Sequence, residues 1–271
     1  MLGGEEAWVD KADMVGLRDA PSFYTKLIRS DRENTWAWYN RAHAWWDLGE
    51  FDNALKDFDE CIRLSPDDEV AYSSRGMTWM AKKEYDRAIK DFTEAIRLKP
   101  DIPFPYCYRG NCFQIKRNLD KALADYAEAI RVDPDFVSAI IDRGTLWHFK
   151  KEYAKAIQEY DQAHRIDAQS FYAQANKAYL LATCKDDALR DGKKALTLAK
   201  EACELAHWKD GWCLSALAAA YAELGQFDEA VTYERKGQAD ADYHKQVYDV
   251  EAFEKAPQRL QSYLSKKAWR D

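Results

Sequence analysis

Residues that interrupt regular structure are scarce in this sequence. Its 271 residues include seven prolines and eleven glycines, a composition that leaves little material for disordered linkers. No apolar run approaches the roughly 18 residues of a membrane-spanning helix, and the N-terminus has no positive region followed by an apolar stretch. We therefore expect one continuous folded array in the cytoplasm, with no membrane partner and no signal peptide.

The motifs of catalytic and metal sites are also missing. None of the five histidines forms HExxH, and none is spaced with cysteine as in a zinc site. Glycine-rich phosphate loops and the GxSxG motif are absent as well. We predict no catalytic residue, no metal and no cofactor, and hence a protein that is not an enzyme. Catalytic residues assembled from distant segments are the alternative.

The six cysteines are too scattered to form a disulfide or zinc framework. Cys61 and Cys203 fall on apolar helix faces, and Cys107 and Cys112 share one helix without a second ligand pair. Free cysteine behaves as a small hydrophobic residue. We predict that the cysteines are reduced and serve packing.

Positive charge is in deficit. The sequence has 40 Lys and Arg against 47 Asp and Glu, a net charge of -7, and its pI is near 5.4. Nucleic-acid binding needs cations that neutralise phosphates, so this balance opposes a nucleic-acid partner.

What the sequence does contain is a fixed period of 34 residues. Arginines recur at this spacing, each followed by a small residue, in the pairs Arg41-Ala42, Arg75-Gly76, Arg109-Gly110 and Arg143-Gly144. Three more columns keep the period: Ala54, Ala88, Ala122 and Ala156; Phe58, Phe92, Tyr126 and Tyr160; and Pro66, Pro100 and Pro134. A period of this length indicates stacked structural repeats.

Each period predicts two helices joined by a turn. In the first period, one helix stops near Gly49, since glycine allows the left-handed turn of a helix end. Asp52 is expected to be the N-cap of a second helix, whose apolar stripe begins at Ala54. Pro66 ends that helix because proline has no N–H and its ring clashes with continued helix.

The order of residue types within each unit resembles the tetratricopeptide repeat. The first unit carries this order in Trp38, Ala42, Trp45, Ala54, Phe58 and Pro66, and the order recurs in phase. The resemblance implies an all-α fold, an α-solenoid of stacked helix-turn-helix repeats that form a right-handed superhelix. It also implies a function in binding other proteins.

The phase of the units divides the chain into three parts. Residues 35–242 form an array of six repeats, at 35–68, 69–102, 103–136, 137–170, 171–210 and 211–242. The fifth repeat has five additional positions, which predicts a longer loop around Cys184 to Gly192.

The two ends are expected to cap the array. Residues 1–34 include an unpaired second helix from Ala20 to Arg32, and Ala7 to Val15 is similar to the closing strand of a small SH3-like barrel or is a plain capping segment. Residues 243–271 are expected to form a capping helix from Tyr243 to about Phe253 and a second helix that opens at Pro257. Terminal repeats need a polar outer face, which we assign to Lys255, Arg259, Lys266, Lys267 and Arg270.

The repeated arginines have two interpretations. One is a basic ladder for phosphate or carboxylate; the other is pairing with the acids of the same period, Asp57, Asp91, Asp125 and Glu159. We favour the pairing, since arginine can bury its stem while its fork binds a carboxylate. A column of large residues that faces the second helix is assigned to the core: Trp45, Trp79, Phe113, Trp147 and Tyr221.

In the family that the sequence resembles, the first helices of successive units line a concave surface. Projection of the helical period predicts a binding site there formed by Trp36, Tyr39, Asn40, His43, Trp46, Met77, Met80, Phe104, Tyr108, Asn111, His148, Tyr172, Asn176 and Tyr179. Aromatic residues offer a large apolar area together with a polar group, which suits protein recognition.

We therefore predict a scaffold or adaptor that binds a peptide or helix of a partner protein in this aromatic groove. Related repeats that grip acidic chaperone termini resemble one another in a clamp of lysines, asparagines and an arginine. The corresponding positions here include Tyr39, Ser74 and Phe104, so such a clamp is not expected. Alternatives are self-assembly into a homo-oligomer through a terminal helix and a regulatory or accessory role in a larger enzyme complex.

Overall fold

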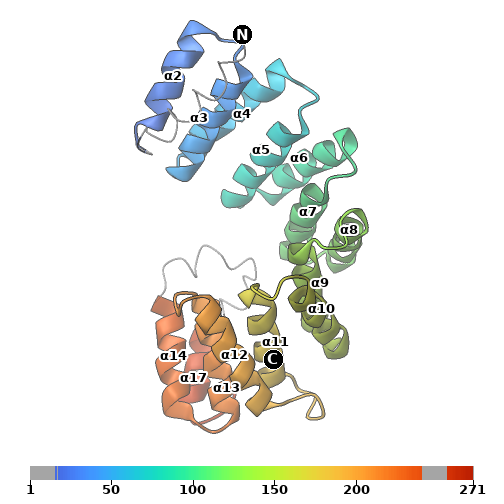
Figure 1. The fold of residues 1–271 in the computed structure, drawn as a ribbon, viewed down its shortest axis with the longest axis vertical. Helices are drawn as coiled ribbons and strands as arrows, with labels where there is room; N and C mark the ends of the chain where they lie inside the picture. Colours follow the sequence, from blue (N-terminus) through green and yellow to red (C-terminus); the bar gives the residue numbers. More distant parts are fainter. Residues whose placement is uncertain (1–15, 17, 240–254, 271) are drawn as a thin grey trace. The chain divides into compact units, whose positions relative to one another are not determined.

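A computed structural model describes residues 16, 18–239 and 255–270 of the chain. Within these residues all regular structure is helical and no strand is present (Figure 1). The chain falls into two compact units, residues 1–112 and 113–271. The predicted SH3-like segment Ala7 to Val15 and the predicted capping helix from Tyr243 lie outside the described residues.

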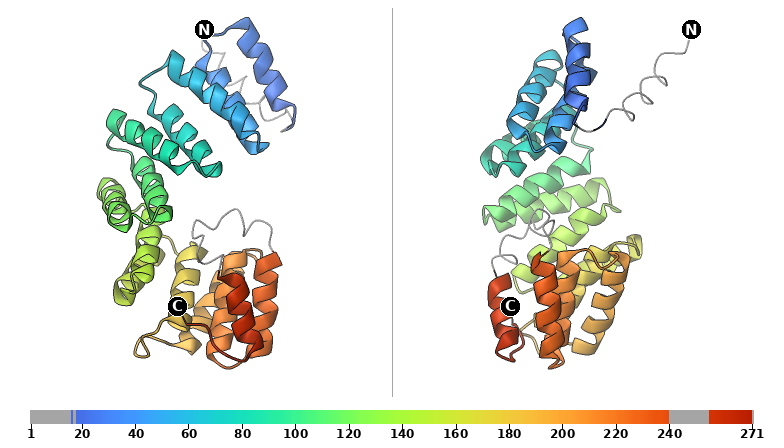
Figure 2. Two further views of the ribbon diagram at one scale, coloured as in Figure 1. Left: turned by 180° about the vertical axis from the view of Figure 1, so that it is seen from behind. Right: turned by 90° about the vertical axis from the view of Figure 1, so that its left-hand side faces the viewer.

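The first unit is built from pairs of consecutive helices. It contains α2 (Ala20–Ser30), α3 (Thr35–Asp47), α4 (Phe51–Leu64), α5 (Glu69–Ala81), α6 (Tyr85–Leu98) and most of α7 (Pro103–Ile115). The main helix contacts join α3 to α4 and α5 to α6, while α2 packs on α3 and α4 packs on α5 (Figure 2). Each pair therefore contacts the next one along the chain.

The second unit continues the same pattern. Its described helices are α8 (Leu119–Val132), α9 (Val137–Phe149), α10 (Tyr153–Ile166), α11 (Phe171–Thr183), α12 (Gly192–Leu205), α13 (Gly211–Glu223), α14 (Phe227–Ala239) and α17 (Ala256–Leu264). α9 packs on α10, α11 on α12 and α13 on α14, and α17 packs on α14. As predicted, a helix opens at Pro257, which occupies its first turn.

The turn inside each helix pair uses a left-handed backbone residue. α3 ends at Asp47 and Gly49 follows with φ of 76°, as predicted. The equivalent residues Lys83, Arg117 and Lys151 have φ of 61°, 60° and 62°, although left-handed backbone is unfavourable for a residue with a Cβ. The packing of the two helices therefore imposes this turn whether or not glycine is present.

The prediction that Asp52 caps the second helix is wrong. The N-cap of α4 is Glu50, and Asp52 lies in the first turn, where it forms an ion pair with Lys82. The left-handed turn places the cap earlier than the sequence pattern indicates. Side-chain caps occur instead at the first helices α3, α5 and α13 and at the second helix α12. At α3, the Oδ1 of Asn34 accepts a hydrogen bond from the backbone N–H of Ala37 at 2.9 Å.

The core alternates small and aromatic side chains in register. The alanines of the repeat column are fully buried, at Ala54, Ala88, Ala122 and Ala156, and so are the aromatic residues Phe58, Phe92, Tyr126 and Tyr160, with exposures of 0–1%. A Cβ added to Gly76 would lie 2.9 Å from the ring of Phe92. Glycine therefore sets how closely the two helices approach, as the sequence predicted.

The column that begins at Trp45 is only partly in the core. All five of its residues are half-buried. In several repeats a cation from the second helix covers the ring: Arg87 lies 4.6 Å from the centroid of Trp79, and Lys155 lies 4.4 Å from that of Trp147. A cation is attracted to the face of an aromatic ring. These contacts therefore join the two helices of a pair at the border between the core and the solvent.

The C-terminal helix caps the second unit through a buried ion pair. Glu234 of α14 stands in the aromatic column, and its Oε1 accepts hydrogen bonds from the Nε and Nη2 of Arg259 at 3.2 and 3.0 Å. Both side chains are 0% exposed. The prediction that Arg259 belongs to a polar outer face is therefore wrong, because α17 turns this residue inward to meet the acid.

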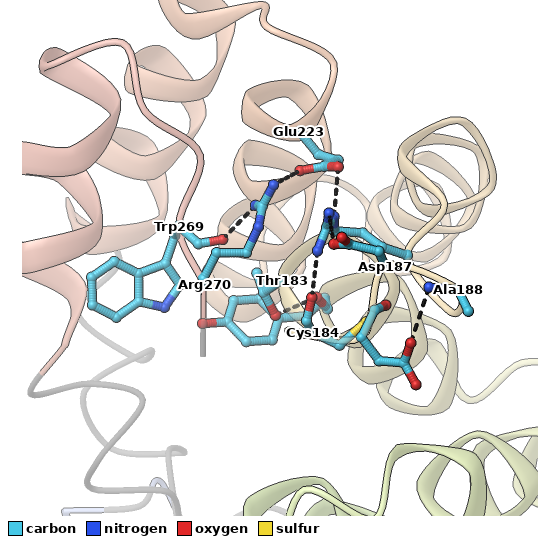
Figure 3. Close-up of polar contacts among 10 residues, drawn as sticks. Thr183, Cys184, Asp187, Ala188, Glu223, Trp269 and Arg270 are labelled. Atoms are coloured by element: carbon cyan, nitrogen blue, oxygen red, sulfur yellow. Dashed lines mark hydrogen bonds and ion pairs between the residues drawn. The ribbon is translucent and has the colours of Figure 1, made fainter.

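The longer loop predicted around Cys184 to Gly192 is present, since residues 184–191 separate α11 from α12. Within this loop, Arg190 donates to the Oε1 of Glu223 at 2.9 Å and to the carbonyl oxygen of Cys184 at 3.0 Å. Arg270, which follows α17, binds the other oxygen of Glu223 at 2.6 Å (Figure 3). The loop and the end of the chain are thus fastened to the same carboxylate of α13.

Candidate functional site

The first helices of the first unit present their predicted residues at different depths. Trp36, Trp46 and Phe104 are 45%, 36% and 53% exposed. Most of the others are half-buried, namely Tyr39, Asn40, His43, Met77, Met80 and Tyr108. Asn111 is only 6% exposed. We call the surface formed by these residues of α3, α5 and α7 the first-helix face.

A cluster of rings supports the α3 part of this face. The rings of Tyr39 and His43 lie 4.5 Å apart, and both contact Phe58 of α4, at 5.9 and 5.5 Å. The hydroxyl of Tyr39 is 3.3 Å from the Oγ of Ser74, which links α3 to α5. These side chains are therefore fixed by the core on one side and reach the surface on the other.

His43 is neutral at pH 7 in this setting. Burial lowers the pKa of its imidazole below the ordinary value of 6.5, and the opposing effect of the nearby Asp47 carboxylate is smaller. The face therefore gains no positive charge from this residue.

The part of the face formed by α5 and α7 rests on Phe92. Met77, Met80 and Tyr108 all pack against the cluster that this ring forms with Ala88. Tyr108 stacks on Phe92 at 5.8 Å with an interplanar angle of 18°, and Phe104 stacks on Tyr108 at 6.5 Å with an angle of 20°. The three stacked rings thus become progressively more exposed, from the buried Phe92 through Tyr108 to Phe104.

Three other predicted residues, Trp36, Asn40 and Trp46, are held by contacts with nearby helices. The Nδ2 of Asn40 donates to the backbone oxygen of Trp36 at 2.8 Å, while the ring of Trp36 meets Tyr24 of α2 edge-on at 5.7 Å. Trp46 lies 6.1 Å from Phe51 at the start of α4. These contacts position the amide and both indoles without burying the indoles.

In the second unit, His148, Asn176 and Tyr179 come together around Trp212. The ring of Tyr179 lies 6.1 Å from His148 and 4.9 Å from Trp212, whose Nε1 donates to the Oδ1 of Asn176 at 2.6 Å. Tyr179 is only 3% exposed, and the guanidinium of Arg259 lies 5.8 Å from its ring centroid. The C-terminal helix therefore covers Tyr179, while His148, Asn176 and Trp212 are half-buried.

Tyr172 stands apart from that cluster. Its side chain is 36% exposed, its ring lies 4.3 Å from Phe171, and its hydroxyl is 3.4 Å from the Oδ2 of Asp210. It is therefore the most accessible of the predicted residues in the second unit.

Arg41, Arg75 and Arg143 pair with the acids of their own period, as predicted. Arg41 binds both carboxylate oxygens of Asp57 at 2.7 and 2.8 Å, and Arg75 binds Asp91 in the same way at 2.8 and 2.7 Å. Arg143 binds Glu159 at 2.9 Å. Such bidentate pairs engage the guanidinium, so these arginines hold helix pairs together instead of forming a basic ladder.

Sequence reasoning missed a second partner of these arginines. Arg41, Arg75 and Arg109 also donate to residues of the preceding second helix, namely Thr25 at 2.8 Å, Asp59 at 2.7 Å and Thr93 at 3.0 Å. These three acceptors also recur with a period of 34, which is the signal that would have found them. Arg75 thus joins two successive repeats, and Arg41 joins the first repeat to α2.

A metal site or a reactive thiol would come from the histidines, cysteines and acids of the described part of the chain. No group of three or more His, Cys, Asp or Glu side chains there could hold a metal ion. All six cysteines are buried and unbridged, and burial raises the pKa of Cys61 and of Cys203 to about 12. Within the same part of the chain, every helix is too short or too polar to cross a membrane.

Comparison with solved structures shows the same fold in several proteins. The chain is similar to the Cut9–Hcn1 hetero-tetramer of the APC/C, with a TM-score of 0.71 and 16% identity over 93% of this chain and 46% of that one. It is similar to MamA 41-end of Desulfovibrio magneticus RS-1, with a TM-score of 0.55 and 16% identity over 63% and 99%. For YrrB, a tetratricopeptide protein described as having an unusual peptide-binding site, the values are 0.51 and 20% over 71% and 96%.

Sequence comparison identifies the repeat itself. A model of the tetratricopeptide repeat matches residues 35–68, 70–102 and 103–136, and a second model of this repeat matches residues 211–237. No curated protein matches the chain by sequence. Together with the paired helices and the period of 34 residues, these matches identify the chain as an array of tetratricopeptide repeats.

Proposed function

We propose that the chain is a non-enzymatic scaffold that binds a peptide or helix of another protein on the first-helix face. The observation that carries this proposal is the set of exposed aromatic residues Trp36, Trp46 and Phe104, each of which packs against a more buried ring. Rings that are already held by neighbouring side chains lose little conformational entropy on binding, and they offer a large apolar area. Repeat arrays use extended surfaces of this kind to bind partners.

The proposal assigns the binding residues of the two units separately. In the first unit they are the residues of the first-helix face, and in the second unit they are Tyr172 and, less accessibly, His148 and Asn176. We leave Tyr179 out because its ring is buried beneath Arg259.

We also propose the arrangement of six repeats between two capping segments. The positions at which the first helices begin support this arrangement, because they coincide with the starts of the six expected repeats: Thr35, Glu69, Pro103, Val137, Phe171 and Gly211. The caps would then be residues 1–34 and 243–271, of which α2 and α17 are the described helices.

The test removes exposed rings and leaves the core intact. The triple variant Trp36→Ala, Trp46→Ala, Phe104→Ala is compared with the control Ile166→Ala, Trp208→Ala, which deletes exposed apolar side chains elsewhere. We expect the triple variant to lose the proteins that the immobilised chain retains from lysate, with helicity unchanged, while the control keeps them. Equal retention by both variants would contradict binding on this face.

The same preparations test self-assembly. Mass measured over a range of concentrations should stay that of one chain if the protein is an adaptor. A mass that rises with concentration, and that the triple variant restores to that of one chain, would favour the assembling scaffold instead.

A further inference from the structure

The exposed apolar side chains of the first unit occupy one position of the repeat. Trp36, Val70 and Phe104 are each the second residue of a first helix, and they are 45%, 45% and 53% exposed. A single exposed apolar residue needs no explanation, but a row of them in successive repeats marks an interaction surface.

An acidic residue accompanies each member of this row. Glu33, Asp67 and Asp101 stand three positions before the apolar residues, and all three are exposed. In the part of the chain that the structure describes, they form no ion pair. They are not the caps of α3 and α5 either, because Asn34 and Asp68 accept those backbone hydrogen bonds. The first unit thus carries paired columns of acidic and apolar side chains.

Positive charge near these columns is largely engaged elsewhere. Lys99 donates to the Oε1 of Glu69 at 2.6 Å, and its charge is also attracted by Asp101. Arg41 and Arg75 are held by the carboxylates of second helices. Arg32 is the exposed cation that precedes Glu33. Three exposed acids, Glu33, Asp67 and Asp101, therefore stand against Arg32 and the already paired Lys99 along this edge.

We propose that the first-helix face of the first unit, extended by Val70 and the acidic column beside it, selects amphipathic segments in which apolar side chains are interspersed with lysine or arginine. This inference rests on the function proposed above and adds the chemistry of the partner. Apolar side chains of the segment would cover Trp36, Val70 and Phe104, while its cations would face Glu33, Asp67 and Asp101. Acidic or phosphorylated segments would be repelled by the same carboxylates.

The experiment is a selection from a random peptide library displayed on phage, with the immobilised full chain as the target. Recovered peptides are sequenced and then synthesised for affinity measurements at low and high salt. We expect enrichment of peptides that combine Leu, Ile, Phe or Trp with several Lys or Arg. Asp67→Asn with Asp101→Asn should weaken their affinity about two- to fivefold per charge at low salt, and less at high salt.

A matched variant controls for net charge. Glu50→Gln with Glu84→Gln removes two exposed acids from the same unit, at N-cap positions where neither side chain makes a capping hydrogen bond. These residues follow the far ends of first helices, about 20 Å from the apolar column along a 13-residue helix. We expect this variant to bind the selected peptides as the parent does.

The outcomes separate the two proposals. Neutral or acidic peptides that still require Trp36 and Phe104 would overturn the basic partner but retain the binding face. Peptides that ignore Trp36→Ala with Phe104→Ala, or no enrichment at all, would overturn both proposals. A concentration-dependent dimer that the same double variant dissociates would replace the basic segment with a second copy of the chain.

Discussion

At the scale of single residues, the contact between Gly76 and Phe92 determines how closely the helices of a repeat pack. A methyl group on Gly76 would lie 2.9 Å from a ring that is itself 0% exposed. Alanine improves helix propensity by up to about 1 kcal/mol, whereas overpacking costs about 1–3 kcal/mol. We expect Gly76→Ala to lower the free energy of unfolding in urea. Adding Phe92→Leu should recover part of the loss, and a Gly76→Ala variant as stable as the parent would contradict this.

His43 provides the pH dependence expected at this scale. Because burial lowers its pKa below 6.5, the unfolded chain takes up the proton more readily than the folded chain. Stability from this residue is therefore full above pH 6.5 and is lost as pH falls toward the lower folded value. The difference in unfolding free energy between pH 7.5 and 5.5 should shrink in His43→Gln. The exposed His207 is the control position, and an unchanged difference in His43→Gln would refute the assignment.

Residue types in phase were enough to predict the small and aromatic columns and the pairing of the arginines. The same patterns were not enough to predict how deeply each side chain is buried. Asn111 and Tyr179 have the helical phase of surface residues, yet they are 6% and 3% exposed. Their burial depends on neighbouring side chains that are distant in sequence, such as Arg259 above Tyr179, and periodicity contains no information about those contacts.

At the scale of helices, the turn between the two helices of a repeat is where local preference and packing disagree. Lys83 has φ of 61°, which costs a residue with a Cβ roughly 1–2 kcal/mol, whereas Gly49 holds the same place in the first repeat without that cost. The period predicted both the turn and the helices that flank it. It did not predict a left-handed lysine, because only the geometry of the packed helices requires that backbone.

Lys83→Gly should therefore stabilise the protein, by up to about 1 kcal/mol once the greater freedom of glycine in the unfolded chain is counted. The same replacement at Lys90, an exposed position inside α6, should destabilise it by about 1 kcal/mol. Urea unfolding of the two variants measures both effects. If both substitutions shifted stability in the same direction, the left-handed turn would not be a strained element.

At the scale of the whole molecule, the end of the chain closes the second unit through contacts that its sequence barely signals. Glu234 interrupts an aromatic column, and that interruption was the visible clue. Its partner Arg259 follows 25 residues later, at a spacing unrelated to the repeat. A repeat pattern describes how each repeat packs on the next one. It therefore cannot specify how a non-repeating helix such as α17 packs on the last helix pair, α13 and α14.

Removing one member of this buried pair should be costly, because the other charge would remain buried without compensation. We expect Arg259→Met to lower the unfolding free energy by about 3–5 kcal/mol, while Glu234→Leu with Arg259→Met should recover most of it. In a repeat array, stability is a sum of units and their interfaces. Hydrogen exchange should therefore speed up in α13, α14 and α17 of the single variant far more than in α3 and α4. If exchange accelerated equally in all helices, the chain would unfold as one cooperative body. If exchange were faster in the double variant than in the single variant, charge pairing would not be what holds α17.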